Sequence, residues 1–232
     1  MRVQTNEQAI KTRTTGVQRA SIIGIVVLVA AVIVSFRPSI PYYIPVAYSL
    51  SLIGLFVVSW SSVMTSKWIG DLRGDQLLAK ALKGLGGDYY LYNYHSPVDH
   101  LLVSSAGCTV LTLKRVDGQV TCRGEKWRRP LNFGRVVRAL SEEQLGNPTR
   151  QAQTHLKAVE SWLQKELPDF QVPTNAVIVF VHPKVELQVS DPVIPVTTIG
   201  DLKVQLRAQP TERKLSSQAL KTLTKLLDDY AA

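Results

Sequence analysis

Two apolar segments near the start of the chain, residues 20–36 and 42–64, are separated by only five residues. Neither segment contains Asp, Glu, Lys or Arg. About 20 apolar residues cross the hydrocarbon core of a bilayer, whereas a helix that packs on a soluble domain is normally apolar on one face only. A connection of five residues, with Arg37 and two prolines, is too short to hold a domain. The sequence therefore predicts a hairpin of two transmembrane helices.

The alternatives to a membrane hairpin are a secretory signal and a buried core hairpin. A signal peptide has a basic start, a shorter apolar centre and a cleavage site of small residues. The basic start is present here, but the first segment is close to spanning length and no A-x-A site follows it. Cleavage after the first segment would still leave the second one in the membrane.

The positive charges that flank the two segments predict their orientation. Six basic residues closely flank the pair: Arg2, Lys11, Arg13 and Arg19 before it, and Lys67 and Arg73 after it. The connection holds only Arg37. Because Lys and Arg favour the cytoplasmic side, we expect a multi-pass protein of the cell membrane with both termini in the cytoplasm. Residues 1–19 are then a basic cytoplasmic tail and residues 20–65 the hairpin.

The part of the chain after residue 65 has the size of one domain. It contains 22 Lys and Arg against 17 Asp and Glu, a net charge of +5, which suits either nucleic acid or the anionic inner leaflet. Its two cysteines, Cys108 and Cys122, suit a reducing compartment, and we expect them to be small buried residues on neighbouring strands.

The order of helical and strand patterns in this part predicts an α/β domain with a mixed sheet. Leucines at helical spacing before Gly84, Gly86 and Gly87 indicate a first helix. Asn147 and Pro148 are typical of the cap and first turn of a long helix, and Ser216 of the cap of a last one. We expect strands at residues 89–94, 99–104, 109–115, 119–122, 175–181 and 193–196, a turn at 106–107, an Asp117-Gly118 hairpin turn, and a further helix at 199–207.

Four short motifs within residues 70–207 give the domain a resemblance to a known family. They are Gly74-Asp75-Gln76, Pro97-Val98-Asp99-His100, the stretch from Gly107 to Lys114 with Gly118, and Asn147-Pro148-Thr149-Arg150-Gln151. In this order they resemble the nuclease-related domain (NERD) family of the PD-(D/E)XK superfamily. The resemblance implies a restriction-endonuclease-like fold over residues 66–210, with residues 211–232 as a helix packed on it.

The resemblance also implies a phosphodiesterase site that holds Mg²⁺. Asp99 takes the place of the family's Asp, Lys114 that of its Lys, and Asp75 that of a helical Glu, so that Asp99 and Asp75 are the expected metal ligands. Gln151 matches the polar residue at the start of the long helix. Carboxylates hold Mg²⁺, and residues i and i+2 of a strand share one face, which is why this chemistry needs an acid two residues before the Lys.

Thr112 stands where that acid is expected. A hydroxyl is a weak ligand, so metal binding and metal-assisted hydrolysis should be severely impaired. Asp117 or Glu125 could supply a relocated acid, although an Asp in a D-G turn has a local use of its own.

A basic, aromatic-bearing segment is the candidate for nucleic-acid binding. It contains Trp127 among the cations Arg115, Arg123, Lys126, Arg128 and Arg129. Such a segment can follow a phosphate backbone, and it can equally face lipid head groups.

Three functions remain open at this point. The first is a membrane-anchored nuclease-related protein that binds nucleic acid, with DNA as the candidate partner, and has an impaired site. The second is an active Mg²⁺-dependent DNA nuclease. The third is a membrane-associated interaction module without enzymatic activity.

The predicted topology can be tested with protease added to intact right-side-out cells. We expect the domain after residue 65 to stay protected, because both termini lie in the cytoplasm, and to be digested once the membrane is permeabilised. Digestion in intact cells would show that the orientation is reversed.

Overall fold

The computed structural model describes residues 1–37, 42–70, 73–130, 142–208 and 214–230. They form two units. The sheet domain contains Met1–Glu7, Gly74–Pro130 and the residues from Gln144 onward, and the helical hairpin lies within Gln8–Arg73. Residues 38–41 of the predicted connection lie outside the described residues.

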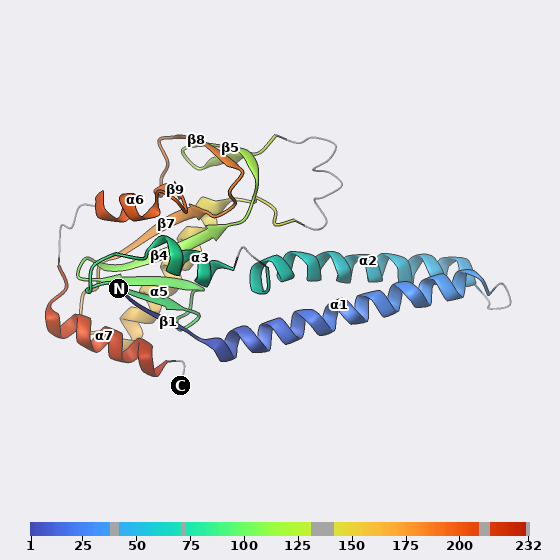
Figure 1. Ribbon diagram of the computed structural model, residues 1–232, viewed down its shortest axis with the longest axis horizontal. Helices are drawn as coiled ribbons and strands as arrows, with labels where there is room; N and C mark the ends of the chain where they lie inside the picture. Colours follow the sequence, from blue (N-terminus) through green and yellow to red (C-terminus); the bar gives the residue numbers. More distant parts are fainter. Residues whose placement is uncertain (38–41, 71–72, 131–141, 209–213, 231–232) are drawn as a thin grey trace. The chain divides into compact units, whose positions relative to one another are not determined.

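A six-stranded mixed sheet forms the centre of the sheet domain, in the order β1-β2-β3-β4-β7-β9 (Figure 1). β2, β3 and β4 are antiparallel, while β1 pairs in parallel with β2, and β7 pairs in parallel with β4 and β9. The strands are β1 Arg2–Thr5, β2 Tyr90–Asn93, β3 His100–Ser104, β4 Gly107–Lys114, β7 Thr174–Phe180 and β9 Val196–Thr198. The mixed α/β fold predicted from the sequence is confirmed.

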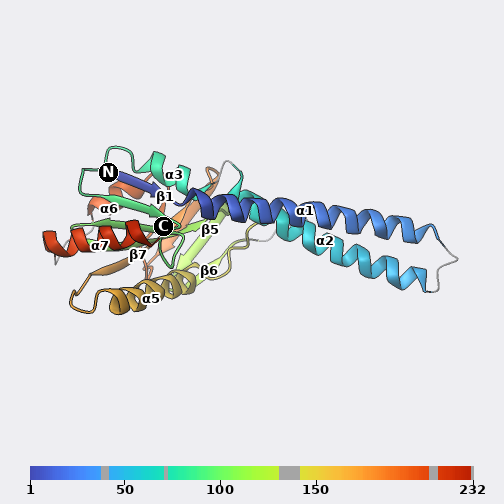
Figure 2. The same cartoon turned by 90° about the horizontal axis from the view of Figure 1, so that it is seen from below.

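Helices cover both faces of this sheet (Figure 2). α5 (Pro148–Glu166) and α7 (Ser217–Asp229) contribute to a core cluster on one face, with Val110 of β4. α3 (Gly74–Ala81) and α6 (Leu202–Ala208) contribute to a second cluster on the other face, with Leu111 of β4. A strand covered on both faces needs apolar side chains at successive positions, and this explains the unbroken apolar run of β7.

Both predicted helix caps are confirmed. The Asn147 side chain accepts a hydrogen bond from the Arg150 backbone N–H, and Pro148 occupies the first turn of α5. The Ser216 hydroxyl accepts one from the Ala219 N–H at the start of α7. These contacts satisfy backbone donors that have no partner inside the helix.

The hairpin predicted at Asp117-Gly118 is wrong. β5 (Gly118–Arg123) does not pair with β4; it lies in a separate sheet, between β6 (Lys126–Arg128) and β8 (Val185–Ser190). Both neighbouring positions of β4 are already taken, by β3 and β7. The chain therefore turns away at Gly118, which has a φ of 68°, and β5 pairs in parallel with β8.

The two cysteines are buried as expected, but they are not on neighbouring strands. Cys108 belongs to β4 of the main sheet and Cys122 to β5 of the smaller one. Burial raises the pKa of the Cys108 thiol to about 12, and it also raises the pKa of Cys122. Both thiols are therefore kept in the neutral form at physiological pH.

The first residues of the chain are part of the sheet domain. We expected a basic tail over residues 1–19, whereas β1 occupies Arg2–Thr5 and α1 (Glu7–Ser35) begins directly after it. The Arg2 N–H donates to the Tyr89 carbonyl (2.9 Å) and the Asn6 N–H to the Asn93 carbonyl (3.0 Å). The segment before the first apolar helix is thus an edge strand of the main sheet. The other strands of that sheet follow the second apolar helix.

The helical hairpin consists of α1 and α2 (Tyr43–Trp68), which pack through residues spaced by seven. The buried positions are Ile10, Val17, Gly24 and Ala31 of α1 and Ala47, Gly54, Ser61 and Trp68 of α2. A repeat of seven is the geometry of a left-handed coiled coil. A Cβ on Gly54 would lie 2.7 Å from Leu28 Cγ, so the two backbones approach closely where the side chains are smallest.

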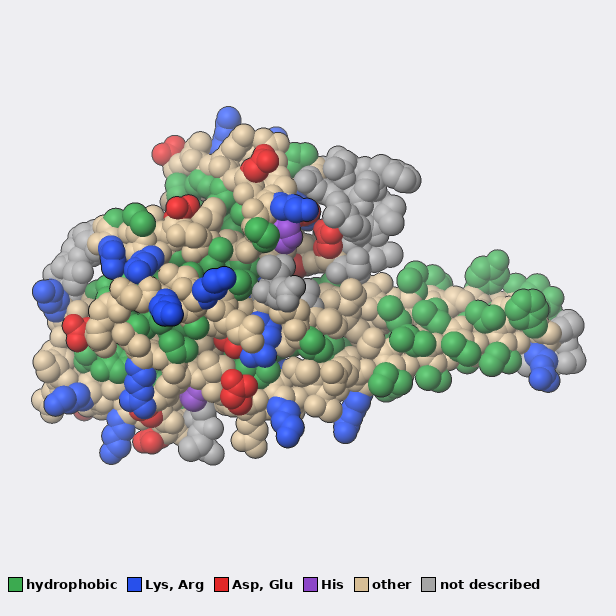
Figure 3. All heavy atoms as spheres, viewed as in Figure 1, with side chains coloured by type: hydrophobic (Ala, Val, Ile, Leu, Met, Phe, Trp, Pro, Cys, Tyr) green, Lys and Arg blue, Asp and Glu red, His purple; other side chains and the backbone are tan. Residues whose placement is uncertain are grey.

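The outer surface of the hairpin is apolar and exposed. Figure 3 shows hydrophobic side chains over its length, and Ile22, Val26, Ile53 and Phe56 are each more than half exposed. α1 and α2 are both long and apolar enough to cross a membrane. A continuous apolar surface of this kind on a helix pair needs lipid or a protein partner to cover it.

The pairing of β1 gives a matched stability test. In parallel pairing alternate residues face the neighbouring strand, so the Gln4 N–H points to β2 and the Val3 N–H to the open edge. Gln4→Pro should lower the thermal unfolding midpoint of the detergent-solubilised chain, because it removes a ladder hydrogen bond worth about 1 kcal/mol and crowds β2. Val3→Pro is the control and should lower the thermal unfolding midpoint much less. Equal midpoints for the two variants would show that β1 does not stabilise the sheet.

Candidate functional site

β4 carries the two strand residues of the predicted site on one face. Cys108 and Val110 belong to the core cluster shared with α5, so Thr112 and Lys114, at the same alternation, face α5 as well. Thr112 is 1% exposed and Lys114 is 5% exposed. The Lys114 ammonium donates to the Gln144 carbonyl at 3.5 Å, which is the long limit for a hydrogen bond.

Thr112 is bonded to α5 and does not point to solvent. Its Oγ1 and the Nδ1 of His155 share a hydrogen bond of 3.2 Å. His155 lies four residues after Gln151, so the two side chains are on the same side of α5, one turn apart. The sequence analysis did not single out His155. Its spacing from Gln151 was the signal that could have identified it.

The two predicted carboxylates come from different sides of the sheet. Asp99 directly precedes β3, and the β3–β4 register, continued by two residues, sets it opposite Thr112. Asp75 is buried in the first turn of α3, the helix that packs on the opposite face. The structure thus brings Asp99, Thr112, Lys114 and the start of α5 together, and it places Asp75 on the far layer.

A buried polar chain lies on the α3 side of the sheet. His100 Nδ1 lies 2.8 Å from Asn93 Oδ1, and Asn93 Nδ2 donates to Thr5 Oγ1 at 3.1 Å. Because Asn93 Oδ1 can only accept, His100 Nδ1 carries the proton. A Cβ on Gly74 would lie 2.5 Å from His100 Nε2, so only glycine fits there. These hydrogen bonds connect β1, which precedes α1, to β2 and β3. α3 begins against these strands.

Asp117, considered above as a relocated acid, forms an ion pair with Arg129. Arg129 Nη2 contacts Asp117 Oδ1, and Arg129 Nε donates to the Asp117 carbonyl at 3.1 Å. The Asp117 side chain is 22% exposed and the Arg129 side chain is 12% exposed. This pair holds the turn at the start of β5 against the end of β6, which is the local use that a D-G turn suggested.

The remaining basic residues divide by exposure. Arg123, Lys126 and Arg128 are exposed on the β5–β6 hairpin. Arg115 is only partly exposed. Trp127 points inward, where its ring lies 5.7 Å from that of Phe180 and its Nε1 donates to Thr149 Oγ1 at 2.8 Å. The hairpin therefore presents cations to solvent while its aromatic side chain attaches it to α5.

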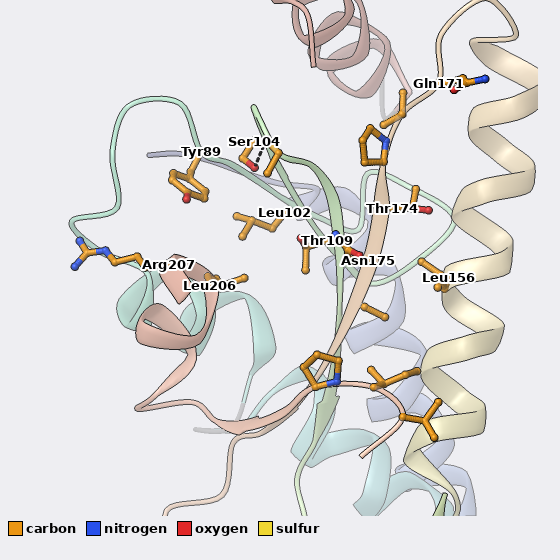
Figure 4. A pocket seen from close by; sticks show the side chains of 17 residues that line it. Tyr89, Leu102, Ser104, Thr109, Leu156, Gln171, Thr174, Asn175, Leu206 and Arg207 are labelled. Atoms are coloured by element: carbon orange, nitrogen blue, oxygen red, sulfur yellow. Dashed lines mark hydrogen bonds between the residues drawn. The ribbon is translucent and has the colours of Figure 1, made fainter. Parts of the chain in front are cut away.

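A hollow of about 830 Å³ lies at the opposite end of β4 and β7 (Figure 4). Thr109, Asn175 and Leu156 contribute to its lining, and Arg207 is the one charged residue among the described residues that line it. Thr109 and Lys114 are five residues apart, roughly 17 Å along the strand. The hollow is therefore separate from the group around Thr112.

The fit of Mg²⁺ to this site depends on how many carboxylates face it. Mg²⁺ prefers near-octahedral oxygen coordination and is usually bound through one or two carboxylates, with waters at the other positions. In the described part of the chain no group of three or more His, Cys, Asp or Glu side chains is placed to hold a metal ion. Of the expected metal ligands, Asp99 is the one that the strand register sets on the α5 face, opposite Thr112.

One match to a known family agrees with this sheet and its flanking helices. It also includes the β4 positions Thr112 and Lys114. Residues 70–181 match the NERD family, described as nuclease-related domain. This segment is thus similar to a nuclease-related domain, and it follows two apolar helices. No curated protein and no solved structure matches it.

The Asp117–Arg129 pair predicts a measurable contribution to stability. Asp117→Asn should destabilise the folded chain by about 1–3 kcal/mol, because a neutral amide replaces the carboxylate that contacts a mostly buried guanidinium. The control is Glu166→Gln, which removes the exposed Lys165–Glu166 pair and should have almost no effect. Denaturant unfolding in detergent measures both. A similar small change in both variants would mean that the buried pair contributes no more than the exposed one.

Proposed function

We propose that this chain is a membrane-anchored nuclease-related protein whose domain binds nucleic acid, and whose phosphodiesterase site is impaired. The observation that carries the proposal is Thr112, the residue at the position of the expected acid, which is buried and bonded to His155. The match to the nuclease-related family, at residues 70–181, supports the assignment to nucleic acid.

The exposed apolar surface of α1 and α2 supports the membrane anchor. The chain enters α1 from β1 and leaves α2 towards α3, and both β1 and α3 belong to the sheet domain. Two helices that cross the membrane must then return the chain to the side from which it came. Together with the flanking positive charges, this favours a cell-membrane protein with both termini in the cytoplasm.

The loss of catalysis follows from the chemistry of the proposed site. The PD-(D/E)XK resemblance assigns hydrolysis to Mg²⁺ held by carboxylates, with a Lys beside the attacking water. Here Asp99 and Lys114 keep their places, while Thr112 offers a hydroxyl that is already bonded to the protein. Asp117 forms an ion pair with Arg129, which favours a local structural role for this carboxylate over that of a relocated acid. The domain therefore keeps the scaffold of a nuclease without its metal site.

Binding to nucleic acid is supported by charge. Arg123, Lys126 and Arg128 are exposed on one hairpin, and the part of the chain after residue 65 has a net charge of +5. Neutralising several phosphates releases counterions, so the affinity should fall steeply with salt. DNA is the partner that we propose to test first.

The test uses the full chain in nanodiscs, because β1 precedes the membrane hairpin. With labelled DNA and Mg²⁺ or Mn²⁺, we expect salt-sensitive binding and no cleavage by the wild type, and a gain of metal-dependent cleavage with Thr112→Glu.

The controls for this experiment separate the alternatives. Cleavage by the wild type that is lost in Lys114→Ala would make the chain an active nuclease and contradict the proposal. Absence of DNA binding at low salt would leave a membrane-associated interaction module. Thr112→Gln, which has the size of Glu without its charge, should not restore cleavage.

A further inference from the structure

The main sheet has an incomplete edge beside the hollow at the start of β7. β4 pairs with all seven residues of β7, whereas β9 pairs only with the last three, Ile178–Phe180. Among the described strands, the first four residues of β7, Thr174–Val177, therefore have a neighbour on one side only. A strand edge of this kind presents backbone N–H and C=O groups with which another extended chain can pair.

Pro195 explains why the pairing with β9 begins no earlier. In a parallel ladder alternate residues direct their N–H and C=O groups to the same neighbouring strand, and the Ile178 N–H donates to the Pro195 carbonyl at 2.9 Å. Continued by two residues, this register sets the Ala176 carbonyl opposite the Pro195 nitrogen, which has no hydrogen to donate. The backbone groups of Thr174 and Ala176 thus point to the open side of β7, and both residues line the hollow.

The hollow extends along both faces of the sheet, with the edge of β7 between them. Leu156 of α5 lines one side, and Leu206 and Arg207 of α6 line the other (Figure 4). Successive side chains of a strand point to opposite faces of its sheet. A strand added to this edge would therefore place its side chains alternately on the α5 side and on the α6 side of the hollow.

The α5 side of the hollow is mainly apolar. Leu156, Val172 and Ile194 contribute to its lining. The acidic group beside it is Glu160 of α5, whose carboxylate accepts a hydrogen bond from Thr174 Oγ1 at 3.0 Å. A second carboxylate placed there would be repelled, so this side suits an apolar side chain of a ligand.

The α6 side of the hollow is polar and basic. Ser104 and Thr109 contribute hydroxyl groups, and Arg207 is the one charged residue among the described residues of the lining. Arg207 is exposed, and its Nη2 donates to the neutral Gly84 carbonyl at 3.5 Å. A guanidinium has five N–H donors, so Arg207 can keep this contact and also bind a carboxylate, which forms shorter and stronger hydrogen bonds. This side therefore suits an acidic side chain.

We propose that the open edge of β7 binds an extended peptide segment of a partner protein, which adds a strand to the main sheet. The segment pairs with the backbone of Thr174 and Ala176. Its side chains alternate between apolar ones beside Leu156 and acidic ones beside Arg207. In strand addition of this kind the backbone bonds give affinity and the alternate side-chain sites give specificity. The proposal is independent of nucleic-acid binding, because the hollow lies at the other end of β4 from Lys114.

The experiment measures binding of a fluorescein-labelled peptide to the full chain in nanodiscs of zwitterionic lipid, by fluorescence anisotropy. The peptide alternates Val and Glu and has the seven-residue length of β7. We expect saturable binding with a dissociation constant on the order of 1 mM or lower, since a few backbone bonds and one ion pair contribute.

A charge exchange tests the role of Arg207. Arg207→Glu should weaken binding of the Val-Glu peptide about tenfold, as expected for loss of a hydrogen bond to a charged group, and a Val-Lys peptide should bind this variant better than it binds the wild type. Lys221→Glu makes the same change of charge at an exposed position of α7. It is the control and should change the affinity of either peptide less than about twofold.

Two methylated peptides test the backbone pairing. In a strand the N–H groups of alternate residues face opposite sides, so N-methylation of the Val residues and of the Glu residues blocks different sets of donors. The set that faces β7 should abolish binding when methylated, and the other set should change it less than about threefold. Absence of saturable binding, equal loss with both methylated peptides, or equal affinity for Arg207→Glu and the wild type would overturn the proposal.

Discussion

The parallel ladder between β4 and β7 is the interaction on which the domain depends. Its seven paired positions, from Cys108 with Thr174 to Lys114 with Phe180, lie between two helical layers. A parallel pair in this setting has to bury both faces, and every residue of β4 is buried, including Thr112 and Lys114. Polar side chains held in such a strand must find partners within the protein. The ladder thereby fixes where Thr112 meets α5, and with it the character of the site.

This ladder also determines what position 112 can hold. A carboxylate there would be buried and would need a cation to neutralise it. Thr112 carries no charge, and its hydroxyl shares a hydrogen bond with His155 Nδ1, so this position needs no metal ion. Lys114 keeps its place, since its long alkyl stem packs along the strand whatever its ammonium contacts.

The sequence was sufficient where the signals are local. Alternation and run length predicted the strands from β2 to β4 and β7, and side-chain chemistry predicted the caps at Asn147 and Ser216. β1 was missed, because Arg2–Thr5 has no apolar alternation and its partner lies more than 80 residues away. The Asp117-Gly118 turn was misread, since its residues do not reveal that β4 has no free edge. The placement of Asp99, Thr112 and Lys114 on one face followed from register, whereas the His155 contact depends on how α5 packs, which no local pattern encodes.

The position of β1 has a consequence for how the protein is made. β1 leaves the ribosome before the two apolar helices, and the strand it pairs with follows only after both helices have been synthesised. The sheet cannot complete its edge until the chain has returned from the helical hairpin, so formation of the β1–β2 pair is a late step of folding. Until then Arg2–Thr5 has no partner strand, and an unpaired strand is a site for wrong pairing with other chains. A hairpin that fails to return the chain would leave this edge of the sheet permanently unfinished.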